Sequence, residues 1–124
     1  MSSIEYLRVF SDSAGCSHFE AKTIELAAQN YAPPAPPLNI SPLQTAKHSL
    51  FLELPAGWYG DWHPTPVRQW MVLISGVCEV EAGDGQRVTC RAGDVVMLDD
   101  LTGKGHRTEV VGDQPVRIAA VHLE

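Results

Sequence analysis

Imidazole side chains are the groups in this sequence best suited to proton transfer or metal binding near neutral pH. His63 lies in the stretch 57–76, GWYGDWHPTPVRQWMVLISG, where a turn rich in glycine and aromatic residues leads into an apolar, β-branched segment. His106 follows a second turn at 99–105, DDLTGKG. The sequence therefore predicts loops that deliver two histidines to the mouths of strands.

The composition is typical of a soluble globular protein. The 124 residues are enough to bury the core of one domain. The net charge is −6 and the nine Lys and Arg residues are spread singly, so no basic stripe is available for nucleic acid or an anionic membrane. The N-terminus lacks the pattern of a secretory signal, and no apolar run approaches the roughly 20 residues of a membrane span. We expect a single cytoplasmic domain over 1–124 that binds neither nucleic acid nor membrane.

Short β-type segments separated by turn signals favour an all-β sandwich or barrel. The segment 4–10 is predicted to be an edge strand, and 18–31 is predicted to be a strand in preference to an amphipathic helix. The proline-rich segment 32–42 predicts an extended connector, which either crosses outside a sheet or packs as an arm on a second subunit. Further strands are expected at 45–54, 69–74, 95–98, 106–111 and 116–123, with a hairpin at 77–91.

The hairpin can be registered from its residues alone. A three-residue turn at 83–85 gives one face apolar and thiol groups and the other face opposite charges. The predicted cross-strand partners are Cys78 with Cys90, Val80 with Val88, Glu81 with Arg87, and Ala82 with Gln86. With Cys16 the cysteine count is odd and there is no C-x-x-C pair, so we expect reduced thiols.

His48 lies on the apolar face of the strand expected at 45–54, because Leu50, Leu52 and Leu54 alternate with it at period two. The side chain is therefore interpreted either as a core histidine or as part of a pocket.

Two segments of the chain resemble motifs of the cupin superfamily, a group of small jelly-roll β-barrels. The first cupin motif is a Gly, five residues, His-x-His, three or four residues, Glu, six residues and a Gly. This spacing is met by Gly57, His63, Gln69 and Gly76, with Thr65 in place of the second His and Gln69 in place of Glu. The second motif matches at Gly93, Asp94 and His106, without its Pro and with a longer turn. The resemblance implies an all-β, cupin-type jelly-roll barrel over 45–124, preceded by N-terminal strands and the connector in 1–44.

The resemblance also implies a metal site inside the barrel. Metal-binding cupins hold iron, manganese, zinc or nickel with three His and one Glu. Carried over by position, His63 and His106 would be ligands, with the Gln69 carbonyl oxygen as a third. This set lacks the carboxylate of a two-His-one-carboxylate site. It implies either a weakly held divalent metal, serving isomerase, lyase, cyclase or oxygenase chemistry, or no metal.

A metal-free site is the competing interpretation. His63 or His106 would then act as a general base, oriented by Asp99 or Asp100, in an epimerase or isomerase. A third alternative is a non-enzymatic module that binds or senses a small molecule. If Gln69 and the residues at period two after it point inward, the pocket is apolar below and polar at its mouth. The other candidate pocket residues are Tyr59, Trp62, Thr65, Arg68, Met71, Asp99 and His48.

Aromatic residues crowd the region of the first motif. Tyr59 and Trp62 either stack on a ligand, beside Arg68 pairing an anionic group, or serve packing alone. Trp58 is expected to close one end of the barrel. Trp70 is out of phase with the inward residues, so we expect it on the outer face or in a dimer interface. We therefore expect a homodimer that binds a small organic ligand.

Overall fold

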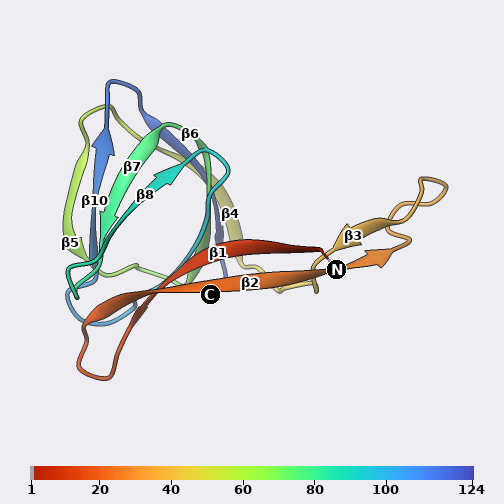
Figure 1. The fold of residues 1–124 in the computed structure, drawn as a ribbon, viewed down its shortest axis with the longest axis horizontal. Coiled ribbons are helices and arrows are strands. Elements are labelled where there is room, and N and C mark those ends of the chain that lie inside the picture. Colours follow the sequence, from red (N-terminus) through yellow and green to blue (C-terminus); the bar gives the residue numbers. More distant parts are fainter. Residues whose placement is uncertain (1) are drawn as a thin grey trace.

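The computed structural model describes residues 2–124 as two facing β-sheets that enclose a barrel (Figure 1). One sheet has seven strands in the order β3-β2-β1-β9-β6-β11-β4, and the other has four in the order β5-β10-β7-β8. Their bounds are β1 (Ser2–Ser11), β2 (Ser17–Gln29), β3 (Leu38–Ile40), β4 (His48–Leu54), β5 (Tyr59–His63), β6 (Gln69–Ser75), β7 (Val77–Glu81), β8 (Arg87–Arg91), β9 (Val95–Asp99), β10 (His106–Val111) and β11 (Val116–His122). This architecture confirms the all-β prediction. Among the described residues there is no helix long and apolar enough to cross a membrane.

β1 lies inside the larger sheet, which corrects its prediction as an edge strand. It pairs antiparallel with β2 along its whole length and parallel with β9 over Leu7 to Phe10. Val9 is completely buried at the point where β1 crosses the barrel. β1 therefore has a partner on each side, and the two edges of this sheet are formed by β3 and β4.

The distal halves of β1 and β2 form an arm that extends away from the barrel, with β3 at its far end (Figure 1). β3 pairs antiparallel with the end of β2, where Leu38 lies opposite Gln29. The proline-rich segment is therefore not only a connector, because it contains a short strand. After β3 the chain returns to the barrel, and the Lys47 amide donates to the His122 carbonyl at 2.8 Å.

The β7–β8 hairpin has the predicted register. Cys78 faces Cys90, Val80 faces Val88 and Glu81 faces Arg87. The Ala82 amide donates to the Gln86 carbonyl, which closes the predicted turn. Cys78 and Cys90 are buried free thiols, and a hydrogen bond with Cys78, together with burial, raises the pKa of Cys90.

Candidate functional site

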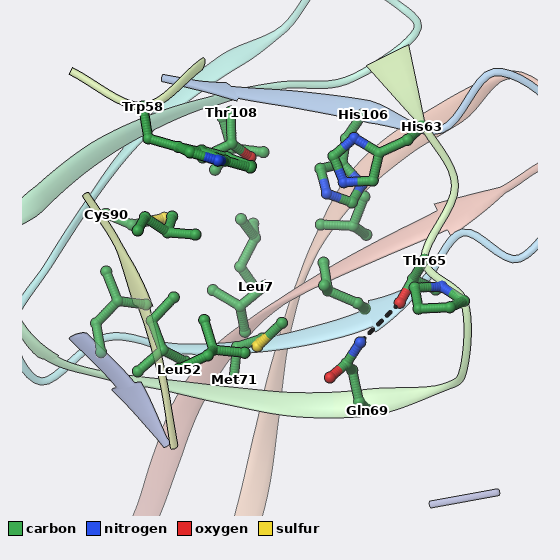
Figure 2. Close-up of a pocket in the computed structure, with 18 of the residues that line it drawn as sticks. Leu7, Leu52, Trp58, His63, Thr65, Gln69, Met71, Cys90, His106 and Thr108 are labelled. Atoms are coloured by element: carbon green, nitrogen blue, oxygen red, sulfur yellow. Dashed lines mark hydrogen bonds between the residues drawn. The ribbon is translucent and has the colours of Figure 1, made fainter. Parts of the chain in front are cut away.

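A cavity of about 320 Å³ lies between the two sheets. Its walls are mostly apolar and come from strands of both sheets. The apolar lining residues are Leu7, Val9, Leu52, Leu54, Trp58, Pro66, Met71, Leu73, Val80, Cys90, Val96, Leu98 and Ile118. Four of the polar lining residues lie at one end of the cavity, where Figure 2 shows His63, Thr65, Gln69 and His106, whereas Thr108 lies beside Trp58.

The two histidines come together because β5 ends where β10 begins. His63 and His106 are cross-strand partners in the antiparallel pair of these strands. Their ring centroids are 4.7 Å apart, with an interplanar angle of 56°. Gly105 allows this approach. Its φ is +77°, and a Cβ at this position would collide with the backbone carbonyl of His63.

His106 forms a buried pair with Asp100. Its Nδ1 lies 2.6 Å from Asp100 Oδ2, and the relative exposures of the two side chains are 5% and 0%. Because a carboxylate oxygen accepts, Nδ1–H is the donor and Nε2 is left without a proton in the neutral ring. Asp100 Oδ1 has no hydrogen-bond partner among the residues that the structure describes.

His63 has the same tautomer for a different reason. Its Nδ1 lies 2.6 Å from the backbone carbonyl oxygen of Asp61, which can only accept. Both imidazoles at the polar end therefore use Nδ1 in an orienting hydrogen bond and carry no proton on Nε2 when neutral.

Gln69 points into the barrel beside these rings and is only 4% exposed. Its Nε2 donates to Thr65 Oγ1 at 3.0 Å, as the dashed line in Figure 2 shows. Thr65 Oγ1 in turn donates to the Val67 carbonyl at 2.7 Å. The backbone amide of Thr65 donates to the Asp100 carbonyl at 3.1 Å. These hydrogen bonds do not use the amide oxygen of Gln69, which is therefore available as an acceptor.

The structure brings His63, His106, Gln69, Thr65 and Met71 into the cavity lining, as the sequence predicted.

Five other candidate residues lie outside the cavity. Tyr59 is 50% exposed on the outer side of β5. Trp62 lies beneath two cations, with Lys104 Nζ 3.9 Å and Arg107 Cζ 5.0 Å from its ring centroid. Neither ring lines the cavity, which favours the packing alternative for both aromatic residues.

Arg68 and Asp99 form an ion pair outside the cavity, in which Arg68 Nε lies 3.6 Å from Asp99 Oδ1. Asp99 also accepts from Arg8 at 2.7 Å. Asp99 lies outside the cavity because side chains alternate between the two faces of β9. Val96 and Leu98 line the cavity, so Asp100 continues their inward phase while Asp99 points outward. The sequence analysis left both aspartates open as the group that orients a histidine. In the structure, Asp100 makes the contact with His106.

His48 is exposed at the start of β4, which corrects its placement in the core or pocket. The predicted face is right, because Leu52 and Leu54 of the same strand line the cavity. However, β4 is an edge strand of the larger sheet, with β11 as its neighbour, and its first residues are exposed.

Several lining residues were missing from the predicted pocket, among them Trp58, Thr108 and His122. Trp58 lies along the cavity wall, because Gly60 has no side chain to displace its ring. His122 is the partner of Gln69 in the β6–β11 pair. It is in phase with Ile118, so the period-two pattern of the last strand could have revealed it.

Comparison with known proteins places this geometry in a family. A family model described as Cupin domain matches residues 50–122. The cupin domain of Cnp3 from Schizosaccharomyces pombe aligns with 99% of this chain and 88% of its own, at 14% identity and a TM-score of 0.53. Protein NMB1881 from Neisseria meningitidis aligns with 61% of this chain and 72% of its own, at 16% identity and a TM-score of 0.44. A search of curated proteins finds no match. The matched region covers β4 to β11, including both motif histidines, and the chain therefore belongs to the cupin domain family.

Proposed function

We propose that the protein binds a small, largely apolar organic molecule in the barrel and moves a proton at the polar end of that molecule. The observation that carries this proposal is the buried His106–Asp100 pair at 2.6 Å, at the polar end of an otherwise apolar cavity. A positioned imidazole with an orienting carboxylate is the arrangement of a general base.

The lining favours a ligand with a single polar group. Apart from histidines, no charged side chain of residues 2–124 lines the cavity. The nearby cations are engaged elsewhere, Arg68 with Asp99 and Lys104 with Trp62. A ligand carrying several negative charges would therefore lose its hydration without gaining ion pairs. A small ketone, or a carboxylic acid in an apolar frame, fits better.

Two neighbouring imidazoles suit an isomerase. The free Nε2 of His106 can take a proton from the carbon next to a carbonyl group, while Asp100 balances the positive charge that forms on the ring. His63, with its ring centroid 4.7 Å away, can return a proton when it is itself protonated. Gln69 fixes the polar end of the ligand through its free amide oxygen or a second N–H.

Solvent deuterium exchange tests this proposal without knowledge of the natural substrate. The protein would be incubated in D₂O with a panel of small apolar ketones, and loss of the α-proton signal would be followed by ¹H NMR. We expect exchange with at least one ketone, and the Asp100→Asn variant should slow it about 10²- to 10⁴-fold. Asp99→Asn is the matched control, since Asp99 points outward, and should leave the rate within a few-fold of the wild type.

Thermal stabilisation by a ketone without exchange would instead favour a non-enzymatic binding module. Exchange that persists unchanged in Asp100→Asn would contradict the assigned role of the His106–Asp100 pair.

A divalent metal ion in the barrel is the second candidate. The free Nε2 atoms of His63 and His106 and the free oxygen of Gln69 form a donor set that would hold an ion weakly, because it contains no anionic group. Asp100 would orient His106 as carboxylates commonly orient metal-binding histidines. A bound ion would supply Lewis-acid polarisation of a carbonyl oxygen.

Metal content separates the two candidates. The protein would be purified without a chelator and analysed by inductively coupled plasma mass spectrometry, beside a His63→Gln variant. An ion retained at the barrel in the wild type and lost in His63→Gln would favour the metal-dependent form. Full exchange activity after chelator treatment would favour the metal-free form.

A further inference from the structure

A second group of ligand-type side chains lies outside the cavity, around the turn between β1 and β2. Asp12, Cys16 and His18 each offer one ligand atom, and these atoms all lie within 4.8 Å of one another. All three residues are half-buried. None of them lines the barrel cavity, so this turn cluster is separate from the site described above.

His18 connects the turn cluster to a second turn. Its Nε2 lies 2.7 Å from Asp12 Oδ2, and its Nδ1 lies 3.0 Å from Asp84 Oδ2 in the β7–β8 turn. A histidine that binds a metal commonly donates its other ring N–H to a carboxylate, which fixes the ring. Asp84 occupies that position here.

The charge of the turn cluster favours a cation. Two carboxylates face one imidazole, so the group carries net negative charge even when His18 is protonated. Arg8 on the neighbouring strand β1 does not neutralise it, because its guanidinium group lies over the Phe10 ring and pairs with Asp99 and Glu20.

We propose that Asp12, Cys16 and His18 bind a zinc ion, with Asp84 orienting His18 and water in the fourth position. Nitrogen, thiolate and carboxylate donors together suit Zn²⁺, whereas Ca²⁺ and Mg²⁺ prefer oxygen ligands alone. In a tetrahedral site the nitrogen and oxygen ligands lie roughly 3.4 Å apart, so the Asp12–His18 contact opens by about 0.7 Å as the ion enters. The protons of the Cys16 thiol and of His18 Nε2 pass to solvent.

The ion has a structural role at the edge of the barrel site. Ser17, between two of the ligands, donates to the Gly105 carbonyl at 2.7 Å and accepts from the Gly83 amide at 2.7 Å. Gly105 directly precedes His106. Zinc at the turn cluster therefore fastens the β1–β2 and β7–β8 turns to the loop that carries the barrel histidine.

Cobalt spectroscopy tests the turn cluster independently of the barrel. Chelator-treated full-length protein, kept reduced by a phosphine, would be titrated with Co²⁺ alone and followed by absorption. We expect one ion per chain and a thiolate-to-cobalt charge-transfer band, which Zn²⁺ then removes by competition. The band should be lost in Cys16→Ser and should remain in Cys90→Ser and His63→Gln, which alter the barrel lining.

Asp84→Asn extends the test without changing a ligand, and it should weaken Co²⁺ binding about 10- to 100-fold. Asp113→Asn, at an exposed turn carboxylate, should have no effect and serves as its control. Circular dichroism would verify that each variant is folded. Absence of the thiolate band in the wild type, or its persistence in Cys16→Ser, would overturn the proposal and leave the turn cluster as a charged contact only.

Discussion

Two histidines in this protein make short contacts with carboxylates in opposite surroundings. The His106–Asp100 pair is 2.6 Å long and almost fully buried, with one ring nitrogen engaged. His18 meets Asp12 at 2.7 Å and Asp84 at 3.0 Å, and its side chain is 33% exposed. The difference shows that a short contact does not define a role. An imidazole with one free nitrogen beside an apolar cavity suits proton transfer. An imidazole with both nitrogens hydrogen-bonded between two surface turns suits holding those turns together.

Glycine substitutions should give the largest difference in the free energy of unfolding between the two regions. Gly105 and Gly85 adjoin the two regions, and both have positive φ, at +77° and +92°. A Cβ at Gly105 collides with the His63 backbone, whereas a Cβ at Gly85 has nothing within 4 Å. We expect Gly105→Ala to lower the free energy of unfolding by about 3 kcal/mol and Gly85→Ala by about 1 kcal/mol, as measured by urea denaturation. Equal losses would show that the loop before His106 is not tightly held against His63.

The carboxylates themselves give the next largest effect. Asp100→Asn places a buried amide N–H group where no acceptor is available. We expect this to lower the free energy of unfolding by about 2 kcal/mol. Asp84→Asn leaves its new donor in reach of water and should cost much less. Urea denaturation of both variants measures the contrast. A larger loss in Asp84→Asn would reverse the ranking that burial predicts.

Gln69→Glu makes the barrel site resemble the turn cluster in charge. The added carboxylate would complete a two-His-one-carboxylate set with His63 and His106. We expect the affinity of the barrel for Zn²⁺ to rise at least about 10-fold, because an anionic ligand replaces a neutral one. Isothermal titration in a Cys16→Ser background, which removes the turn cluster, measures it. Unchanged affinity would mean that residue 69 does not share a site with the two histidines.

The smallest effect concerns pH and the metal-free turn cluster. The hydrogen bond to Asp12 raises the pKa of His18 above its usual 6.5, and the same bond lowers the pKa of Asp12 below its usual 3.8. The stability gained from His18 is complete below pH 6.5 and is lost as pH rises through its raised folded-state pKa. The gain from Asp12 is complete above pH 3.8 and is lost as pH falls through its lowered pKa.

With a chelator present, wild type should therefore exceed His18→Gln in stability most clearly between pH 3.8 and 6.5. The difference should shrink toward alkaline pH. Urea midpoints across pH measure it, and a difference that grows toward alkaline pH would contradict the assigned ion pairs.

Much of the barrel could be predicted because each strand carries its own local signals. The hairpin register followed from charge pairing and turn length, and the motif spacing located His63, Gln69 and His106. Parity along β9 would also have separated Asp100 from Asp99, had the inward phase of Val96 and Leu98 been extended by one more residue.

Other features depend on contacts between distant segments, which local patterns do not contain. β1 became internal because β9 pairs with it in parallel, 89 residues further along the chain at Leu7 and Val96. The turn cluster needs Asp84 to meet His18 across 66 residues. His48 failed as a core residue because alternation along the strand does not reveal that β4 lies at an edge of the sheet. The homodimer stays a prediction.

In the proposed site His106 keeps Nε2 free while Asp100 holds Nδ1. Long-range ¹H–¹⁵N NMR correlation spectra of the histidine rings test it directly, with His106→Gln and His18→Gln spectra providing the assignments. We predict that neutral His106 carries its proton on Nδ1, and that His18 in chelator-treated protein at pH 6 carries protons on both nitrogens. A neutral His106 with its proton on Nε2 would contradict the proposed role of the His106–Asp100 pair.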